Sequence, residues 1–177
     1  MTMRRIRYCC AVSLDGYIAG PGGEFDWIVM DPEMDFVGLS DQFDTHLLGR
    51  KTFEATGGRD QSSPGVRAFV FSRTLRQNDY RNVTIVSENW KELVKSLREE
   101  SGKDIWLFGG GSLFRSLAEE GLVDTVEVGI IPTLLGAGVP LVAQPASRMG
   151  LTLQEHRVYE QTGTVGLVYS VSRPGQG

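Results

Sequence analysis

The sequence has few of the residues that build disulfide, redox or metal sites. Its two cysteines, Cys9 and Cys10, are adjacent and lie in an apolar run, so no CxxC spacing exists. The HxE and PCxxC motifs of the zinc-dependent deaminases are missing as well. We therefore expect both cysteines to be small core residues and the protein to hold no metal.

Long apolar runs and an excess of positive charge are also missing. No stretch reaches transmembrane length, and Ser13 and Asp15 interrupt the first apolar run, which is not typical of a signal peptide. The 18 lysines and arginines are outnumbered by 22 acidic residues, for a net charge of −4. Bulk charge therefore gives the chain no means of attracting nucleic acid or an anionic membrane. We expect a cytoplasmic protein whose partner is a small molecule.

The 177 residues contain no repeat and no long linker, which favours one domain over residues 1–177. Apolar runs and helical patterns alternate along the chain. Strands are predicted at 6–14, 45–48, 67–71, 83–86, 105–108 and 126–130, and a C-terminal hairpin at 151–158 and 164–172. This order predicts an α/β three-layer sandwich with a mostly parallel central sheet of about eight strands and an antiparallel C-terminal hairpin.

Two helix starts carry capping signals. Asp31, Pro32 and Glu33 have the order of an N-cap, a first-turn proline and a first-turn acid, which predicts a helix from Asp31 toward Phe43. Asn89 is followed three residues later by Glu92, as in a capping box, at the start of a helix over residues 89–100.

Ligands of parallel sheets bind at the carboxyl ends of the strands, and cations follow two of these ends. Arg50 and Lys51 open a helix directly after the strand that stops at Gly49. Cations at a helix start oppose the helix dipole, so a bound anion explains them better than the dipole does, although a solvated basic surface is the alternative. Ser72 and Arg73 follow the next strand and suit a phosphate monoester, or alternatively form a cap and a surface arginine.

A third strand end is rich in glycine. Gly109, Gly110 and Gly111 stand between a buried strand and a helix, where a backbone without side chains can approach a ligand and point N–H groups at it. The pattern is neither a GxGxxG motif nor a Walker motif. A plain glycine-rich connection is the alternative interpretation.

Together these segments resemble the dihydrofolate-reductase-like fold. They are most similar to the reductase (C-terminal) domain of the bifunctional riboflavin-biosynthesis deaminase–reductase, here as a stand-alone protein. The matching segments are 11–20 (AVSLDGYIAG), 49–53 (GRKTF), 72–73 (SR), 108–113 (FGGGSL) and 132–141 (PTLLGAGVPL). The last of these resembles the riboflavin branch rather than true dihydrofolate reductases.

The resemblance implies an NADPH site. In it, Arg50, Lys51, Ser72 and Arg73 would hold the 2′-phosphate and neighbouring phosphates, and the three glycines would face the pyrophosphate. The Gly109–Gly110 peptide bond would be cis, and residues 15–27 would cover the reaction site. Ala11 and Ile18 would flank the nicotinamide, and the cofactor set would be completed by Gly49, Thr52, Ser112 and Leu113.

The resemblance implies an NADPH-dependent oxidoreductase similar to 5-amino-6-(5-phosphoribosylamino)uracil reductase, acting on a small heterocyclic or sugar-linked substrate. Dihydrofolate reductases anchor the pterin with one acid on the first helix. Asp31, Glu33 and Asp35 lie in that region, and each could equally be an acid that the helix dipole favours. An NADPH-binding module without catalysis and a dihydrofolate-reducing enzyme stay open as alternatives. The resemblance also implies a homodimer, in which apolar segments such as Val165–Tyr169 could be shared.

Overall fold

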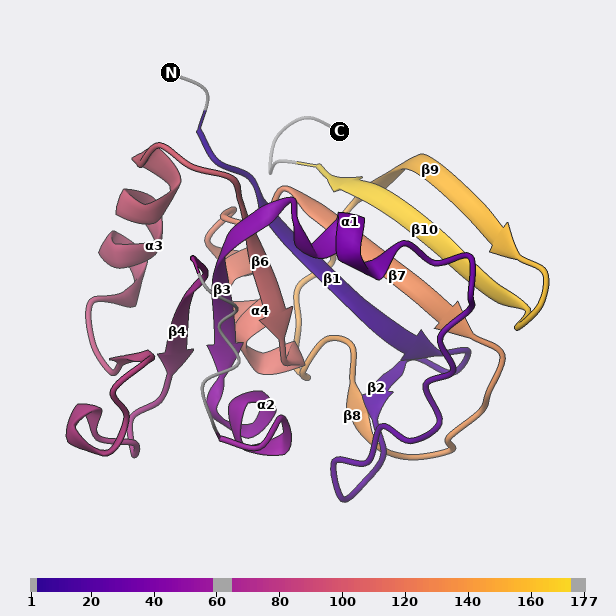
Figure 1. Ribbon diagram of the computed structural model, residues 1–177, viewed down its shortest axis with the longest axis horizontal. Coiled ribbons are helices and arrows are strands. Elements are labelled where there is room, and N and C mark those ends of the chain that lie inside the picture. Colours follow the sequence, from indigo (N-terminus) through magenta and orange to yellow (C-terminus); the bar gives the residue numbers. More distant parts are fainter. Residues whose placement is uncertain (1–2, 59–64, 173–177) are drawn as a thin grey trace.

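The computed structural model describes residues 3–58 and 65–172 (Figure 1). Its large sheet consists of β1 (Ile6–Ser13), β3 (Phe43–Gly49), β4 (Arg67–Phe71), β5 (Thr84–Val86), β6 (Asp104–Gly109), β7 (Thr125–Ile131), β9 (Leu151–Tyr159) and β10 (Thr164–Val171). A separate antiparallel pair consists of β2 (Tyr17–Ala19) and β8 (Val139–Pro140). The helices are α1 (Phe36–Ser40), α2 (Arg50–Ala55), α3 (Trp90–Glu99) and α4 (Gly111–Glu119), with a 3-10 turn at Gln77–Asp79.

The large sheet has the order β5-β4-β3-β6-β1-β7-β10-β9. All neighbours from β5 to β7 run parallel, whereas β10 is antiparallel to both β7 and β9. The predicted fold, a mostly parallel sheet that ends in an antiparallel C-terminal hairpin, is therefore confirmed.

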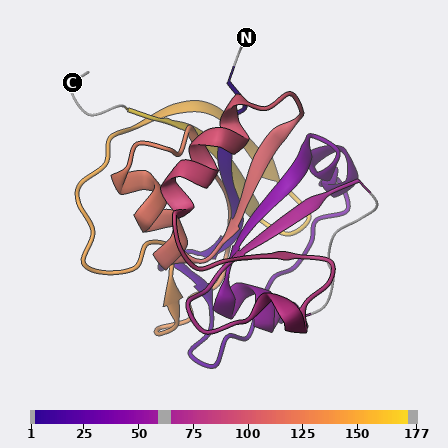
Figure 2. The same ribbon diagram turned by 90° about the vertical axis from the view of Figure 1, so that its left-hand side faces the viewer.

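Helices cover both faces of this sheet. Side chains alternate along each strand, so each strand contributes residues to both faces. One face, which carries Tyr8 and Leu107, packs on α3 and α4 in the main core. We call it the α4 face. The opposite face, which carries Cys9 and Trp106, packs against Leu39 of α1, and we call it the α1 face. Figure 2 shows α3 and α4 on one side of the strands and α1 on the other.

The first predicted helix start was wrong, and the second was confirmed in position but not in its capping box. The first helix comprises only Phe36–Ser40 and is capped by Asp35, whose Oδ1 accepts the N–H of Gly38 at 2.8 Å. Asp31 instead stabilises a turn, because its Oδ1 accepts the N–H of Glu33 at 2.9 Å. The second helix begins after Asn89, as predicted, but Asn89 is left-handed (φ 51°) and makes no side-chain capping bond, so no capping box forms.

Cys9 and Cys10 are both free thiols on β1, and Cys9 is buried, as expected for a core residue. Burial raises the pKa of the Cys10 thiol to about 12, so it stays protonated at neutral pH. Within residues 3–58 and 65–172, no helix is both long enough and apolar enough to cross a membrane.

Candidate functional site

One large cavity, of about 1740 Å³, opens at the carboxyl ends of β1, β3, β4 and β6 and extends over the α1 face of the sheet. It is lined by every residue of the predicted cofactor set: Ala11, Ile18, Gly49, Arg50, Lys51, Thr52, Ser72, Arg73, Gly109, Gly110, Gly111, Ser112 and Leu113. Five separate segments of the sequence therefore meet at one site, as the strand-end argument predicts.

The start of α4 presents free backbone N–H groups to this cavity. Its N-cap is Gly110, which has no side chain to accept a bond from the first turn. The N-cap of α2 is likewise a glycine, Gly49, and a Cβ there would lie 3.5 Å from the Gly109 carbonyl oxygen. The two helix starts are thus neighbours, and the uncapped first turn of α4 favours an anion.

The three glycines differ in what surrounds them. The Gly109–Gly110 peptide bond is cis, as the resemblance implied, and Gly109 has a φ of +137° that other residues rarely adopt. Gly110 is extended, and a Cβ on it would lie 3.2 Å from Thr52 Oγ1, so the Thr52 side chain would have to shift. A Cβ on Gly111 would lie 2.5 Å from the carbonyl oxygen of Pro140. Gly111 is therefore fixed by packing within the protein itself.

Three cations surround the start of α2 and the end of β4. Arg73 and Lys51 are exposed and have no ion pair with any described residue. Arg50 reaches only Glu54, at 3.5 Å, and both side chains are more than 40% exposed, so the pair adds little stability. These cations are therefore available to an anionic ligand.

Ser72 is buried, and its hydroxyl holds the turn that follows β4. Its Oγ accepts the N–H groups of Thr74 and Leu75 at 3.2 and 3.0 Å. The hydroxyl proton can go either to Thr74 Oγ1, 3.3 Å away, or to a ligand. No helix begins at Ser72, so the alternative of a helix cap is wrong; Ser72 holds a turn and can still donate its hydroxyl proton to a phosphate.

Of the three acids considered for the substrate, only Asp35 lines the cavity. The buried Asp31 accepts the backbone N–H and the hydroxyl of Thr162 at 3.1 and 2.9 Å. Its pKa lies below the ordinary value, chiefly because the Glu33 N–H stabilises the charged form. Glu33 itself forms an ion pair with Arg157 at 3.3 Å.

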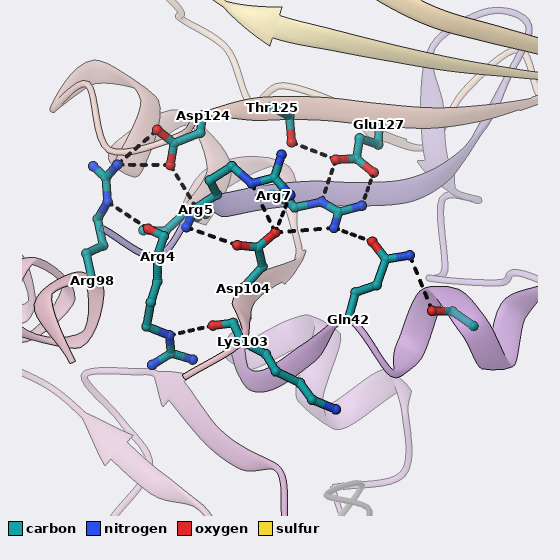
Figure 3. A network of polar contacts seen from close by, with 12 residues as sticks. Arg4, Arg5, Arg7, Gln42, Arg98, Lys103, Asp104, Asp124, Thr125 and Glu127 are labelled. Atoms are coloured by element: carbon teal, nitrogen blue, oxygen red, sulfur yellow. Dashed lines mark hydrogen bonds and ion pairs between the residues drawn. The ribbon is translucent and has the colours of Figure 1, made fainter. Parts of the chain in front are cut away.

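The sequence analysis missed a polar network on the α1 face of the sheet (Figure 3). Arg7 donates to both carboxylate oxygens of Glu127 at 2.7 Å and to Gln42 Oε1 at 2.6 Å. Thr125 also donates to Glu127, at 2.7 Å. Burial opposes the charge on Glu127, but the Arg7 guanidinium outweighs it, so the pKa of Glu127 lies below its usual value. Glu127 and Gln42 line the cavity, so this network forms part of its floor.

Aromatic residues that the analysis assigned only to a buried strand form one wall of the cavity. Trp106 lies 5.1 Å from Phe108 and 5.9 Å from Phe36, measured between ring centroids, and all three line the cavity. Strand alternation places Trp106 and Phe108 on the same face, so the pattern held the signal. The sequence pattern could not show where α1 lies. Because α1 leaves Trp106 and Phe108 partly uncovered, both side chains line the cavity.

Comparison with known proteins identifies close relatives over most of the chain. The family model described as RibD C-terminal domain matches residues 4–165. The uncharacterized protein YyaP of Bacillus subtilis (strain 168) is 38% identical over 96% of both chains. The riboflavin biosynthesis protein RibD of Corynebacterium ammoniagenes is 26% identical over 76% of this chain, which spans 45% of that protein.

Solved structures show the same fold. A Shewanella sp. PV-4 protein, provisionally assigned to riboflavin biosynthesis, superposes with a TM-score of 0.78 at 26% identity, covering 96% of this chain and 99% of that one. Enterococcus faecalis dihydrofolate reductase, complexed with NADP(H) and RAB-propyl, superposes with a TM-score of 0.70 at 16% identity, covering 96% of this chain and 97% of that one. The Thermotoga maritima diaminohydroxyphosphoribosylaminopyrimidine deaminase/5-amino-6-(5-phosphoribosylamino)uracil reductase superposes with a TM-score of 0.70 at 13% identity. The match covers 96% of this chain and 57% of that one.

Proposed function

Because the chain belongs to the RibD C-terminal domain family, we propose that it is an NADPH-dependent reductase of a small heterocyclic or sugar-linked compound. One observation supports this above the others. A single cavity contains the uncapped start of α4, the glycine turn before it and the three cations Arg50, Lys51 and Arg73. A dinucleotide with three phosphate groups needs anion sites of these kinds close together.

The residues present fit the cofactor. In our proposal Arg50, Lys51, Ser72 and Arg73 hold the 2′-phosphate, while the turn at Gly109–Gly111 and the first N–H groups of α4 face the pyrophosphate. No cap side chain competes for these groups, since Gly110 is the N-cap. Ala11 and Ile18, which line the same cavity, flank the nicotinamide ring. When bound, NADPH supplies the hydride, and the protein supplies binding, orientation and exclusion of water.

The segment between β2 and α1 is placed to exclude that water. Several of its residues line the cavity opposite the sheet, among them Ile28 and Met34. The bonds from Thr162 to Asp31 hold the same segment against the β9–β10 turn. Asp35 is the one predicted acid at the cavity, and we propose it as the candidate that faces substrate. Because Asp31 and Glu33 are bonded elsewhere, the pterin anchor of a dihydrofolate reductase is not reproduced by them.

Two measurements test the proposal. Calorimetric titration should show NADPH binding, and NADPH oxidation should follow addition of an oxidised aminouracil riboside, monitored by the loss of reduced-nicotinamide absorbance. Binding without turnover on aminouracil or pteridine compounds would favour a non-catalytic module. Failure to bind NADPH at all would contradict the proposal itself.

A further inference from the structure

The cavity has a second end, away from the cations of α2, which we call the β9 end. Its floor is the α1 face of β1, β7, β10 and β9. Two cross-strand rows make up this floor: Cys9–Glu127–Val168–Glu155 and Ala11–Gly129–Gly166–Arg157. The segment between β2 and α1 also lines the cavity, and Asp31 bonds it to the β9–β10 turn through Thr162.

The charges at the β9 end differ from those at the cofactor end. Among the described residues that line the cavity, Arg157 is the one cation here, whereas Arg50, Lys51 and Arg73 lie at the other end. Arg157 is already paired with Glu33 at 3.3 Å, and its guanidinium lies 4.8 Å from the Tyr159 ring centroid.

Carboxylates outnumber cations at this end. Asp35 and Glu155 both line it, whereas Glu33, which neutralises Arg157, lies outside the lining. Glu127 is neutralised by Arg7, which lies beside it on the same face of the sheet. The β9 end therefore carries a net negative charge, and a doubly charged phosphate placed there would meet carboxylates before it met a free cation.

The wall that borders the β9 end beside β1 is aromatic and apolar. Trp106 of β6 donates its indole N–H to the Cys9 carbonyl oxygen of β1 at 3.0 Å, and the rings of Phe36 and Phe108 lie beside it. Met34, Leu39 and Val168 extend the apolar lining. Such a surface suits a flat ring that stacks on aromatic side chains and gives up its water at little cost.

The floor leaves room for such a ring. A Cβ on Gly129, in the middle of β7, would meet only Thr164 Cγ2, at an ordinary 3.7 Å. Neither φ nor internal packing demands glycine at this position, although glycine weakens a strand interior. The missing side chain instead enlarges the cavity over its central floor.

From the charge, the wall and the floor together we propose that the β9 end takes the flat, uncharged ring system of the substrate, and that this substrate carries no phosphate. The proposal rests on the proposed function for the identity of the other end. It separates this protein from enzymes whose substrate is a phosphoribosyl compound.

Matched ligand pairs that differ by one phosphate test the proposal. The first pair is 5-amino-6-(5-phosphoribosylamino)uracil and the same compound without its phosphate, and the second is riboflavin 5′-phosphate and riboflavin. Calorimetry is run on the protein alone and on protein saturated with NADP⁺, which prevents turnover. In each pair, we expect the member without phosphate to bind at least about tenfold more tightly than the phosphorylated member. Equal affinity, tighter binding of the phosphorylated members, or no binding of either uncharged member would overturn the proposal.

Two variants separate the role of Arg157 from that of the carboxylates. Arg157→Gln should not weaken the phosphorylated members relative to the uncharged ones. Glu33→Gln, which frees Arg157, should improve binding of the phosphorylated members only. If Arg157→Gln instead weakens the phosphorylated members tenfold or more, Arg157 is a phosphate ligand and the proposal is wrong. Titration with NADP⁺ alone reports separately on the proposed function.

Discussion

At the scale of single residues, Arg50 and Arg73 are expected to set the preference for NADPH over NADH. The two cofactors differ by one phosphate, and a charge-assisted hydrogen bond to it contributes about 1.5–3 kcal/mol. Arg50→Ala or Arg73→Ala should therefore weaken NADPH binding roughly ten- to a hundredfold and leave NADH binding almost unchanged. Calorimetric titration of both cofactors measures this.

The control for these variants is Arg76→Ala. Arg76 is also an exposed arginine, three residues beyond Arg73, but it does not line the cavity. It should change neither affinity. An equal loss for both cofactors in the Arg50 and Arg73 variants would mean that the arginines serve the shared pyrophosphate or the fold.

Two adjacent glycines are expected to give opposite results. Gly110 has an extended backbone, so Gly110→Val should fold, but its side chain would enter the cavity beside Thr52 and abolish NADPH binding. Gly111→Ala would place a Cβ within 2.5 Å of the Pro140 carbonyl oxygen and should destabilise the protein by about 1–3 kcal/mol. Thermal unfolding and NADPH titration of both variants check this. Wild-type affinity in Gly110→Val would contradict the assigned phosphate site.

At the scale of elements, the contact between Asp31 and the β9–β10 turn makes the stability of the protein depend on pH. Hydrogen bonds from Glu33 N–H and Thr162 lower the pKa of Asp31 in the folded state. The lowered pKa stabilises the folded protein at pH values above the ordinary carboxyl pKa of about 4. This stabilisation is lost as the pH falls through the pKa of Asp31 in the folded state.

Asp31→Asn should therefore lower the melting temperature at pH 7, and the difference from wild type should shrink at pH 3. The exposed Glu33→Gln serves as a control and should change the melting temperature little at either pH. A difference that stays constant from pH 7 to pH 3 would show that the Asp31 carboxylate is not the group responsible.

The same segment shows why parts of the fold escaped the sequence. The strand β4, over Arg67–Phe71, was predicted with its observed bounds and the other strands of the large sheet to within two residues at each end, because a buried apolar run needs no partner to be recognised. The first helix was misplaced because Asp31 meets Thr162, which is 131 residues away, and a local capping pattern cannot reveal that contact. The short strands β2 and β8 were missed for a related reason, since their pairing joins segments far apart in the chain.

The candidate site was likewise predictable only where it depends on local sequence. The half that we propose for the cofactor consists of local strand-to-helix turns, so Gly109–Gly111 and Arg50–Thr52 could be placed together from the sequence. Its other half depends on which strands lie side by side. The register that places Gly129 beside Ala11 and Gly166 comes from the tertiary structure alone.

At the scale of the whole molecule, we expect a homodimer that forms through β9. This strand is at the edge of the sheet, and Leu151, Leu153 and Val158 are 44%, 49% and 57% exposed. An unpaired edge with exposed apolar side chains is a surface that soluble proteins normally cover. The segment Val165–Tyr169 lies in β10, which is paired on both sides, so it cannot supply the edge that a second copy would pair with.

Light scattering of wild type and two variants checks the dimer. Leu153→Glu places a charge on the apolar face and should shift the mass toward that of a monomer. Gln154→Glu alters the next residue, on the other face of the strand, and should leave the dimer intact. A monomer mass for wild type over a wide concentration range would remove the claim.

The position of β1 in the sheet has a consequence for synthesis of the chain. Its residues leave the ribosome well before their partners, which come about a hundred residues later: Ile6 pairs with Ile105 and Arg7 with Thr125. Until β6 and β7 have emerged, the apolar strand Ile6–Ser13 has nothing to pair with and is exposed to aggregation or chaperone capture. The cavity is therefore completed only after β10, the last strand that lines it, has been translated.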